Sequence, residues 1–173
     1  MRVALCQMPV SSDLSVNLGR VQKALADAAL AGAQLAVFPE GTQVRFGTDL
    51  RAAAEPTDGP FCRGLSEAAR EHGVAVVAGV FEPGPGRRVY NTAVAFDARG
   101  RLAAAYRKIH MFDIVAPDGT AYKESASIKP GEDIVSYEID GMKVGCAICY
   151  DIRFFELFLQ LDEAQRAEFL AAC

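Results

Sequence analysis

The chain has 173 residues, of which 51% are hydrophobic, and its formal net charge is -4. This length and composition suit one compact domain with a substantial core. Charges of both signs are scattered without a run of lysine or arginine, so nothing indicates a nucleic-acid partner. No apolar stretch approaches the length of a membrane span, and residues 1–9 lack the features of a signal peptide, so we expect a cytoplasmic protein.

The cysteine and histidine content limits the possible chemistry. Five cysteines, an odd number without a framework spacing, indicate free thiols in a reducing compartment. The two histidines are His72 and His110, so a histidine-rich metal site is not expected. His110 is the histidine near the candidate reactive groups described below, and any Cys–His mechanism would depend on it.

The first forty residues predict a strand, a helix and a second strand. Residues 2–9 read as a strand, and Asp13 or Ser15 can cap the helix that follows. That helix has one apolar face, formed by Leu18, Val21, Leu25 and Ala28. Residues 35–38 are apolar without alternation, as expected for a strand covered on both faces. Glu40 therefore follows the carboxyl end of a buried strand, where open α/β sheets bind their ligands.

The middle of the chain predicts a loop, a helix and two hairpins. Residues 41–60 carry glycine, proline and charge and read as a loop long enough to shape a pocket wall. Residues 61–72 form an amphipathic helix. The predicted strands are residues 74–81, 89–96 and 102–107. Short turns join these strands, so we expect hairpins and a mixed sheet, with Lys108 directly after the last strand.

The last predicted hairpin leads to a cysteine. Residues 114–131 read as a loop that holds Tyr122-Lys-Glu-Ser125, and residues 134–139 and 143–148 form the hairpin. The strand stops at Cys149, and a helix is expected to begin there. A thiol at such a corner faces the free N–H groups of the helix, which favour the thiolate. Cys149 is therefore a candidate nucleophile.

Other interpretations of this cysteine remain open. Cys149 can be one more buried thiol on an apolar strand. Cys146 fits that inert role better, because it lies inside the strand among small and apolar neighbours. The pair also forms a C-x-x-C motif, a possible redox or zinc half-site. Strand geometry argues against this, because it places the two thiols on opposite faces, and the sequence has no second Cys/His pair.

Three residues that stand at strand ends form a chemical set. Glu40, Lys108 and Cys149 can converge if their strands share one sheet or two facing sheets. The carboxylate can take the thiol proton, the ammonium can stabilise the anion formed on attack at a carbonyl, and the N–H of Tyr150 can add a second oxyanion contact. Taken singly, Glu40 can be a solvated loop carboxylate and Lys108 a surface charge or a partner for Asp113.

Four segments together resemble one known family. They are Phe38-Pro-Glu40, Tyr106-Arg-Lys-Ile-His110, Tyr122-Lys-Glu-Ser125 and Gly145-Cys-Ala-Ile-Cys-Tyr-Asp-Ile-Arg-Phe154. Their order, spacing and flanks resemble the nitrilase, or carbon–nitrogen hydrolase, superfamily over residues 2–157. The residues around the second and third segments resemble the branch of omega-amidases and deaminated-glutathione amidases.

The resemblance implies a fold, a mechanism and roles for named residues. The fold would be α/β, a partial α-β-β-α sandwich with mixed sheets, in a single domain over residues 1–173. The implied roles are general base for Glu40, intermediate stabiliser for Lys108, nucleophile for Cys149, a second orienting glutamate for Glu124, and substrate carboxylate binding for Arg153. The implied reaction cleaves a small amide through a Cys thioester, releases ammonia and needs no metal or organic cofactor. We expect Glu40 and Cys149 to share a proton as a coupled pair.

The pattern departs from the family after Phe154. The family usually continues with Pro-Glu-Leu and a second half of comparable size, whereas here Phe155 stands in place of the proline. We therefore expect a C-terminally truncated domain: a fragment, a frameshifted product or one piece of an assembly such as a homo-oligomer. The last helix is apolar nearly all round at its start, so it needs burial on more than one side. Open edges and uncovered faces predict poor solubility of an isolated monomer.

Two functions of different classes follow. The first is a small-amide hydrolase, and the second is a catalytically silent module that keeps the triad residues and acts in assembly or binding. A flavodoxin-like binding domain is disfavoured, because no glycine-rich phosphate loop follows any strand.

Overall fold

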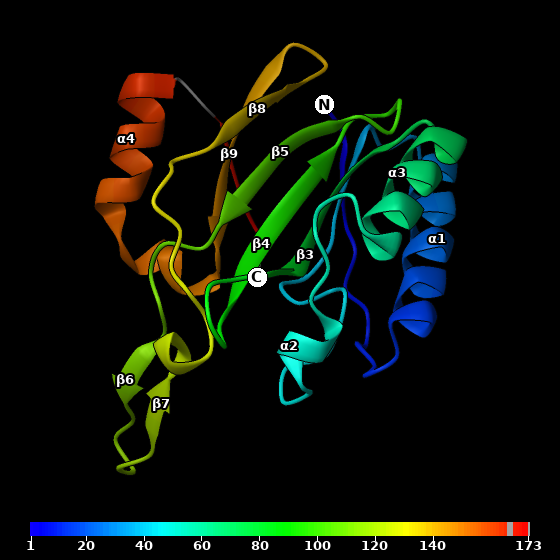
Figure 1. Ribbon diagram of the computed structural model, residues 1–173. Helices are drawn as coiled ribbons and strands as arrows, with labels where there is room; N and C mark the ends of the chain where they lie inside the picture. Colours follow the sequence, from blue (N-terminus) through cyan, green and yellow to red (C-terminus); the bar gives the residue numbers. More distant parts are fainter. Residues whose placement is uncertain (166–167, 173) are drawn as a thin grey trace.

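The computed structural model describes residues 1–165 and 168–172 (Figure 1). The predicted domain also includes residues 166–167 and 173, which lie outside the described residues. The helices are α1 (Leu14–Leu30), α2 (Leu50–Ala53), α3 (Pro60–His72) and α4 (Phe155–Gln165), with short 3₁₀ helices η1 (Glu124–Ala126) and η2 (Cys149–Arg153). The strands are β1 (Val3–Leu5), β2 (Leu35–Val37), β3 (Ala75–Pro83), β4 (Val89–Phe96), β5 (Leu102–Arg107), β6 (Asp113–Val115), β7 (Ala121–Lys123), β8 (Ser136–Ile139), β9 (Met142–Ile148) and β10 (Glu168–Ala172).

The larger sheet is mixed, as the hairpin pattern predicts. Its strand order is β1-β2-β3-β4-β5. The pairs β1–β2 and β2–β3 are parallel, whereas β3–β4 and β4–β5 are antiparallel hairpins. Strands β1 and β5 therefore form the two edges of this sheet.

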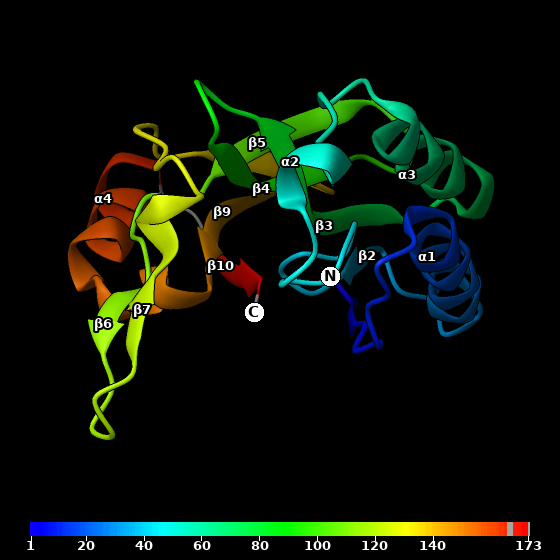
Figure 2. The ribbon, with the colours of Figure 1, turned by 60° about the horizontal axis from the view of Figure 1, so that its bottom comes forward.

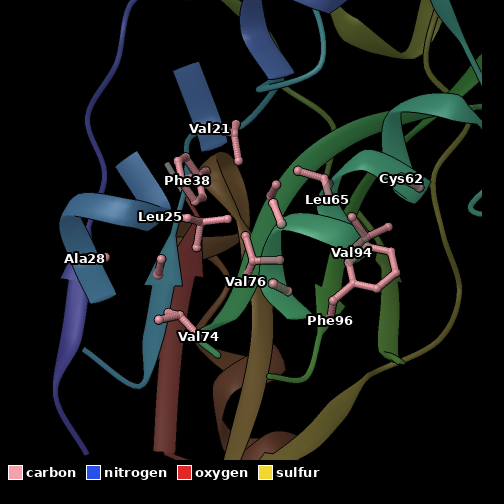
Figure 3. Packing of buried hydrophobic residues seen from close by; sticks show 14 of the residues in the cluster. Val21, Leu25, Ala28, Phe38, Cys62, Leu65, Val74, Val76, Val94 and Phe96 are labelled. Carbon is pink, nitrogen blue, oxygen red and sulfur yellow. The ribbon is translucent and has the colours of Figure 1, made fainter. Parts of the chain in front are cut away.

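Helices α1 and α3 cover one face of the larger sheet (Figure 2). Asp13 caps α1, its Oδ1 accepting from the Ser15 N–H at 2.8 Å. Figure 3 shows how α1 and α3 pack on alternate sheet residues. Labelled members of this core are Val21, Leu25, Ala28, Phe38, Cys62, Leu65, Val74, Val76, Val94 and Phe96. The predicted apolar face of the first helix is thus buried in this core.

The opposite face of the larger sheet packs against a second sheet, in the order β10-β9-β8. Because successive strand residues point to opposite faces, Val76 faces the helices while Val77 lies in the core between the sheets. Helix α4 covers the outside of the second sheet, where Leu157 and Leu161 pack on Ala147. The layers run helix, sheet, sheet, helix (Figure 2), which confirms the predicted sandwich with mixed sheets.

Several local predictions were wrong or incomplete. The predicted loop over residues 114–131 contains the β6–β7 hairpin, which projects away from both sheets (Figure 1). The predicted loop over residues 41–60 contains the one-turn helix α2. The predicted helix after the strand ending at Ile148 is the five-residue η2, and α4 begins only at Phe155. Strand β10, which pairs parallel with β9, was not predicted.

Helix α4 is buried on one side rather than on several. Leu157 and Leu161 are buried, but Phe155 is 63% exposed and Leu159 is 39% exposed. The two buried residues are four apart and so share the face that meets β9. None of the described helices is long and apolar enough to span a membrane.

Candidate active site

The predicted site residues reach one cavity from three strand ends. Glu40 follows β2, Lys108 follows β5, and Cys149 follows β9. Together with Glu124 they line a cavity of about 380 Å³. The rest of its wall is formed by Phe46, Leu50, Phe112, Tyr122, Lys123, Ser127 and Ile128. The cavity is therefore mostly apolar and holds a few polar groups, as is usual for a site that binds a small molecule.

Lys108 lies at the centre of the polar groups. Its side chain is 2% exposed, and its Nζ is 3.2 Å from Glu40 Oε1 and 3.0 Å from the Glu124 carboxylate. Burial lowers the pKa of Lys108, but the charge of Glu40 and the hydrogen bond and charge of Glu124 outweigh it, so the pKa is raised overall. The amine is therefore a permanent ammonium under ordinary conditions. It pairs with these two carboxylates and not with Asp113.

Glu40 is held by groups that the sequence interpretation did not identify. The buried Asn91 of β4 donates from Nδ2 to Glu40 Oε1 at 2.6 Å. The backbone around Glu40 also passes very close to Gly79 of β3, where an added Cβ would lie 2.8 Å from the Glu40 Cα and 2.5 Å from the Gly41 nitrogen. Glycine at position 79 thus permits the approach that brings Glu40 over the sheet.

Glu124 is anchored at the base of the β6–β7 hairpin. Its Oε2 accepts from the Phe112 N–H at 2.6 Å, while the carboxylate also contacts Lys108. The Glu124 carboxylate is thus fixed by a backbone donor on one side and by the Lys108 ammonium on the other.

Cys149 has an uncommon backbone conformation. Its φ is +46°, in the left-handed region that side chains other than glycine rarely adopt. It is the first residue of η2 and lines the cavity. Because η2 has only five residues, the thiol does not face a long helix as the sequence suggested. Strain at a cavity-lining residue is typical of functional positions.

Cys62 and Cys146 are buried, whereas Cys149 is half-buried. Burial raises the pKa of Cys146 to about 12, and burial together with the charges of Glu55, Glu82 and Asp58 raises that of Cys62 to about 12. Cys146 lies in the core between the sheets, as expected for an inert thiol. Within the described residues, no cluster of metal-ligating side chains was found, so the C-x-x-C motif has no completed metal site there.

Tyr150, Arg153 and His110, the other residues considered from the sequence, lie outside the cavity wall. The Tyr150 ring meets the Phe112 ring edge-on, with centroids 5.1 Å apart. Arg153 is exposed, and the cavity wall does not include it. His110 stacks on Phe154 with centroids 3.7 Å apart and pairs through Nδ1 with Asp151 at 2.8 Å. This arrangement directs His110 toward Asp151 and gives no support for a Cys–His mechanism.

Asp151 is the second polar residue that the sequence interpretation missed. It is fully buried, and its carboxylate accepts four hydrogen bonds. The donors are the Tyr106 hydroxyl at 2.7 Å, the Ile148 N–H at 2.9 Å, the His110 N–H at 2.9 Å and His110 Nδ1 at 2.8 Å. The one sequence signal was its position two residues after the candidate nucleophile.

Known proteins resemble this chain in sequence. The family profile described as carbon-nitrogen hydrolase matches residues 2–173. Hydrolase Rv0480c of Mycobacterium tuberculosis is 42% identical over 100% of this chain and 60% of its own length. Omega-amidase NIT2 of Danio rerio is 39% identical over 90% of this chain and 57% of its own length.

Solved structures share the fold. The NitN amidase from Nesterenkonia sp. AN1 superposes with a TM-score of 0.83 at 27% identity, covering 99% of this chain and 66% of that one. The Caenorhabditis elegans NitFhit protein has a TM-score of 0.83 at 26% identity, covering 98% of this chain and 43% of that one. The chain spans between 44% and 60% of the length of the curated relatives it matches. The profile match over nearly the whole chain, with the sandwich fold, shows that this chain belongs to the carbon–nitrogen hydrolase family.

Proposed function

We propose that this protein hydrolyses the amide of a small carboxylate-bearing molecule and releases ammonia. The observation that carries the proposal is the buried Lys108 ammonium between the carboxylates of Glu40 and Glu124, in a cavity that Cys149 also lines. Relatives support the reaction class, since one is an omega-amidase. A Glu→Gln variant of a related amidase has been captured with acrylamide added to its active-site cysteine, and a Cys→Ala variant of it with butyramide bound.

The proposed cycle begins with formation of a thioester. Glu40 takes the proton of the Cys149 thiol as the sulfur attacks the amide carbon, and the carbonyl oxygen becomes an oxyanion. The Lys108 ammonium and the Tyr150 N–H stabilise this charge. The carbon–nitrogen bond then breaks, and the nitrogen leaves as ammonia with the proton that Glu40 returns.

Hydrolysis of the thioester completes the cycle. Glu40 accepts a proton from water as the water oxygen attacks the thioester carbon. Collapse of the second oxyanion breaks the carbon–sulfur bond, and the sulfur regains the proton as the acid leaves. The steps move protons and one acyl group, so they require no metal or organic cofactor. Glu124 keeps the ammonium aimed at the oxyanion position through its 3.0 Å contact.

A carboxylate on the substrate requires a cation that the acidic groups have not neutralised. Lys108 faces two carboxylates, so the three groups together carry one net negative charge. Arg153 is the carboxylate ligand implied by the family pattern. Lys123, whose exposed side chain lines the cavity, is a second candidate for the same role.

The test is ammonia release from monoamides of short dicarboxylic acids. We expect the wild-type chain to release ammonia and a Cys149→Ser variant to lose essentially all of that activity, because the serine hydroxyl is a far weaker nucleophile. Circular dichroism of both proteins checks that the fold is intact. If both are equally silent while folded, the hydrolase proposal fails and the alternative remains, namely a catalytically silent module that acts in assembly or binding.

Three further properties belong to this proposal. We expect residues 1–173 to act as one domain, because both sheets share a continuous core between them. A homo-oligomer is supported by exposed apolar side chains near η2 and α4: Ile152 at 59%, Phe155 at 63% and Leu159 at 39%. We place the reaction in the cytoplasm, as the cysteine pattern suggests.

A further inference from the structure

The buried carboxylate of Asp151 joins the two chain segments that carry Lys108 and Cys149. Tyr106 and His110 lie two residues before and two residues after Lys108, and both donate to Asp151. Ile148, which immediately precedes Cys149, donates its N–H to the same carboxylate. Asp151 therefore binds the residues on either side of Lys108 and also the residue just before Cys149.

The four donors require a carboxylate. All of them present N–H or O–H groups, and an ionised Asp accepts at both oxygens, whereas an amide would place an NH₂ group against at least one donor. Because the carboxylate only accepts, we assign the proton of the His110–Asp151 contact to His110 Nδ1. The side chain is fully buried, so solvent cannot replace a lost partner.

The bond to Ile148 acts directly on the nucleophile's backbone. Cys149 adopts a φ of +46°, which is strained for a residue with a Cβ. Such a conformation persists only where surrounding contacts impose it. The Asp151 side chain folds back across η2 and accepts the N–H of the residue preceding Cys149 at 2.9 Å, so this bond fixes the backbone that enters Cys149.

We propose that Asp151 is a positioning residue that keeps the Cys149 sulfur and the Lys108 ammonium in one reactive arrangement. This inference rests on the proposed function. Asp151 does not line the cavity and touches no reacting atom. It acts through the backbone at Ile148 and His110, so its removal changes geometry rather than substrate binding.

The test compares Asp151→Asn with Glu82→Gln. Glu82 is a matched control, because it is another buried carboxylate, held by Thr92 at 2.7 Å and by Arg107 at 3.0 Å, and the catalytic cavity does not include it. Urea unfolding establishes that each variant is folded under the assay conditions. For Asp151→Asn we expect kcat to fall about 100-fold with KM changed less than about threefold. Glu82→Gln should lose stability but keep the wild-type kcat.

A second readout does not depend on amide hydrolysis. Alkylation of the Cys149 sulfur by methyl vinyl sulfone, which carries no amide to hydrolyse, followed by peptide mass spectrometry, measures whether the sulfur keeps its reactivity. We expect the rate to fall about tenfold in Asp151→Asn and to stay unchanged in Glu82→Gln. A merely structural role would not alter this rate in a folded protein.

The outcomes separate the two proposals. Wild-type kcat and alkylation in a folded Asp151→Asn variant overturn the positioning role and leave the amidase proposal intact. If the wild-type chain releases no ammonia, the amidase proposal is wrong. The ratio of the alkylation rates of wild type and Asp151→Asn then tests the positioning role by itself. Should Asp151→Asn fail to fold, Tyr106→Phe removes one of the four donors. An alkylation rate about threefold lower supports the inference, and an unchanged rate contradicts it.

Discussion

Lys108 is a buried cation, and its contribution to the stability of the fold depends on pH. Its folded-state pKa is raised above the ordinary value of 10.5, so as the pH rises past 10.5 the unfolded chain releases this proton first. The stabilisation from the ammonium is therefore fully present below pH 10.5 and is lost as the pH rises toward the folded-state pKa. The two carboxylates beside it depend on the same charge.

We predict that Lys108→Met removes both activity and this alkaline dependence. The variant leaves Glu40 and Glu124 without their cation, which should cost about 3–5 kcal/mol of unfolding free energy at neutral pH. Urea midpoints measured from neutral to strongly alkaline pH should fall less steeply for the variant than for wild type. Lys143→Met, at an exposed position on β9, is the control and should keep the wild-type slope. Equal slopes for all three proteins would contradict the interpretation.

The cation that binds the substrate carboxylate can be identified by substitution. We predict that Lys123→Gln raises KM about tenfold for a dicarboxylate monoamide, because a charge-assisted contact contributes about 1.5–3 kcal/mol. KM for a neutral amide such as propionamide should not change. If Arg153→Gln gives this split instead, the family pattern holds and Lys123 is only part of the wall. If neither variant raises KM for the monoamide more than for the neutral amide, the substrate needs no carboxylate and the proposed substrate class is wrong.

At the scale of elements, β3 and the segment after β2 must approach closely for Glu40 to reach the cavity. We predict that Gly79→Ala lowers kcat at least about tenfold and destabilises the fold by about 1–3 kcal/mol, since its Cβ would overlap the backbone at Glu40. Gly19→Ala is a matched control on the exposed side of α1, where a Cβ meets nothing within 4 Å. That change should leave activity intact and stabilise the protein by about 1 kcal/mol. Equal changes in kcat and in stability for Gly79→Ala and Gly19→Ala would contradict the packing argument.

The same scale shows why some elements were predictable. The strands that end before Glu40 and Cys149 contain continuous apolar runs, and β5, which ends before Lys108, alternates buried and exposed residues, so the ends of these strands follow from the sequence. The β6–β7 hairpin was missed because its three-residue strands project from the sheets and contain no buried residue, so the sequence has no buried face to mark them. The sequence did not predict that α4 begins only at Phe155. Between Cys149 and α4 the backbone forms η2, which is held by a hydrogen bond to the Asp151 side chain and has no helical periodicity to reveal it.

Asn91 and Asp151 show what a single sequence does not reveal. Each is a polar residue inside an apolar segment, and its partners come from distant positions: Asn91 pairs with Glu40, and Asp151 with Tyr106 and His110. Local pattern identifies chemistry at strand ends. The groups that hold this chemistry in place become visible only when the two sheets are stacked.

At the scale of the whole molecule, exposed apolar side chains gather near the start of α4. We predict that the protein self-associates and that Phe155→Glu shifts the sedimentation profile toward the monomer, because a charge on this surface opposes apolar contact. Leu30→Glu is the control, since Leu30 is 88% exposed at the far end of α1. A sharp monomeric boundary for wild type would contradict the prediction, as would equal shifts in both variants.

The excess of negative charge around Lys108 has a consequence for turnover. The cavity holds two carboxylates and one ammonium, and the reaction creates a new carboxylate at the carbon that was an amide. The newly formed anion lies near two like charges that the uncharged amide group did not repel. Electrostatic repulsion should therefore speed departure of the acid and weaken inhibition by product.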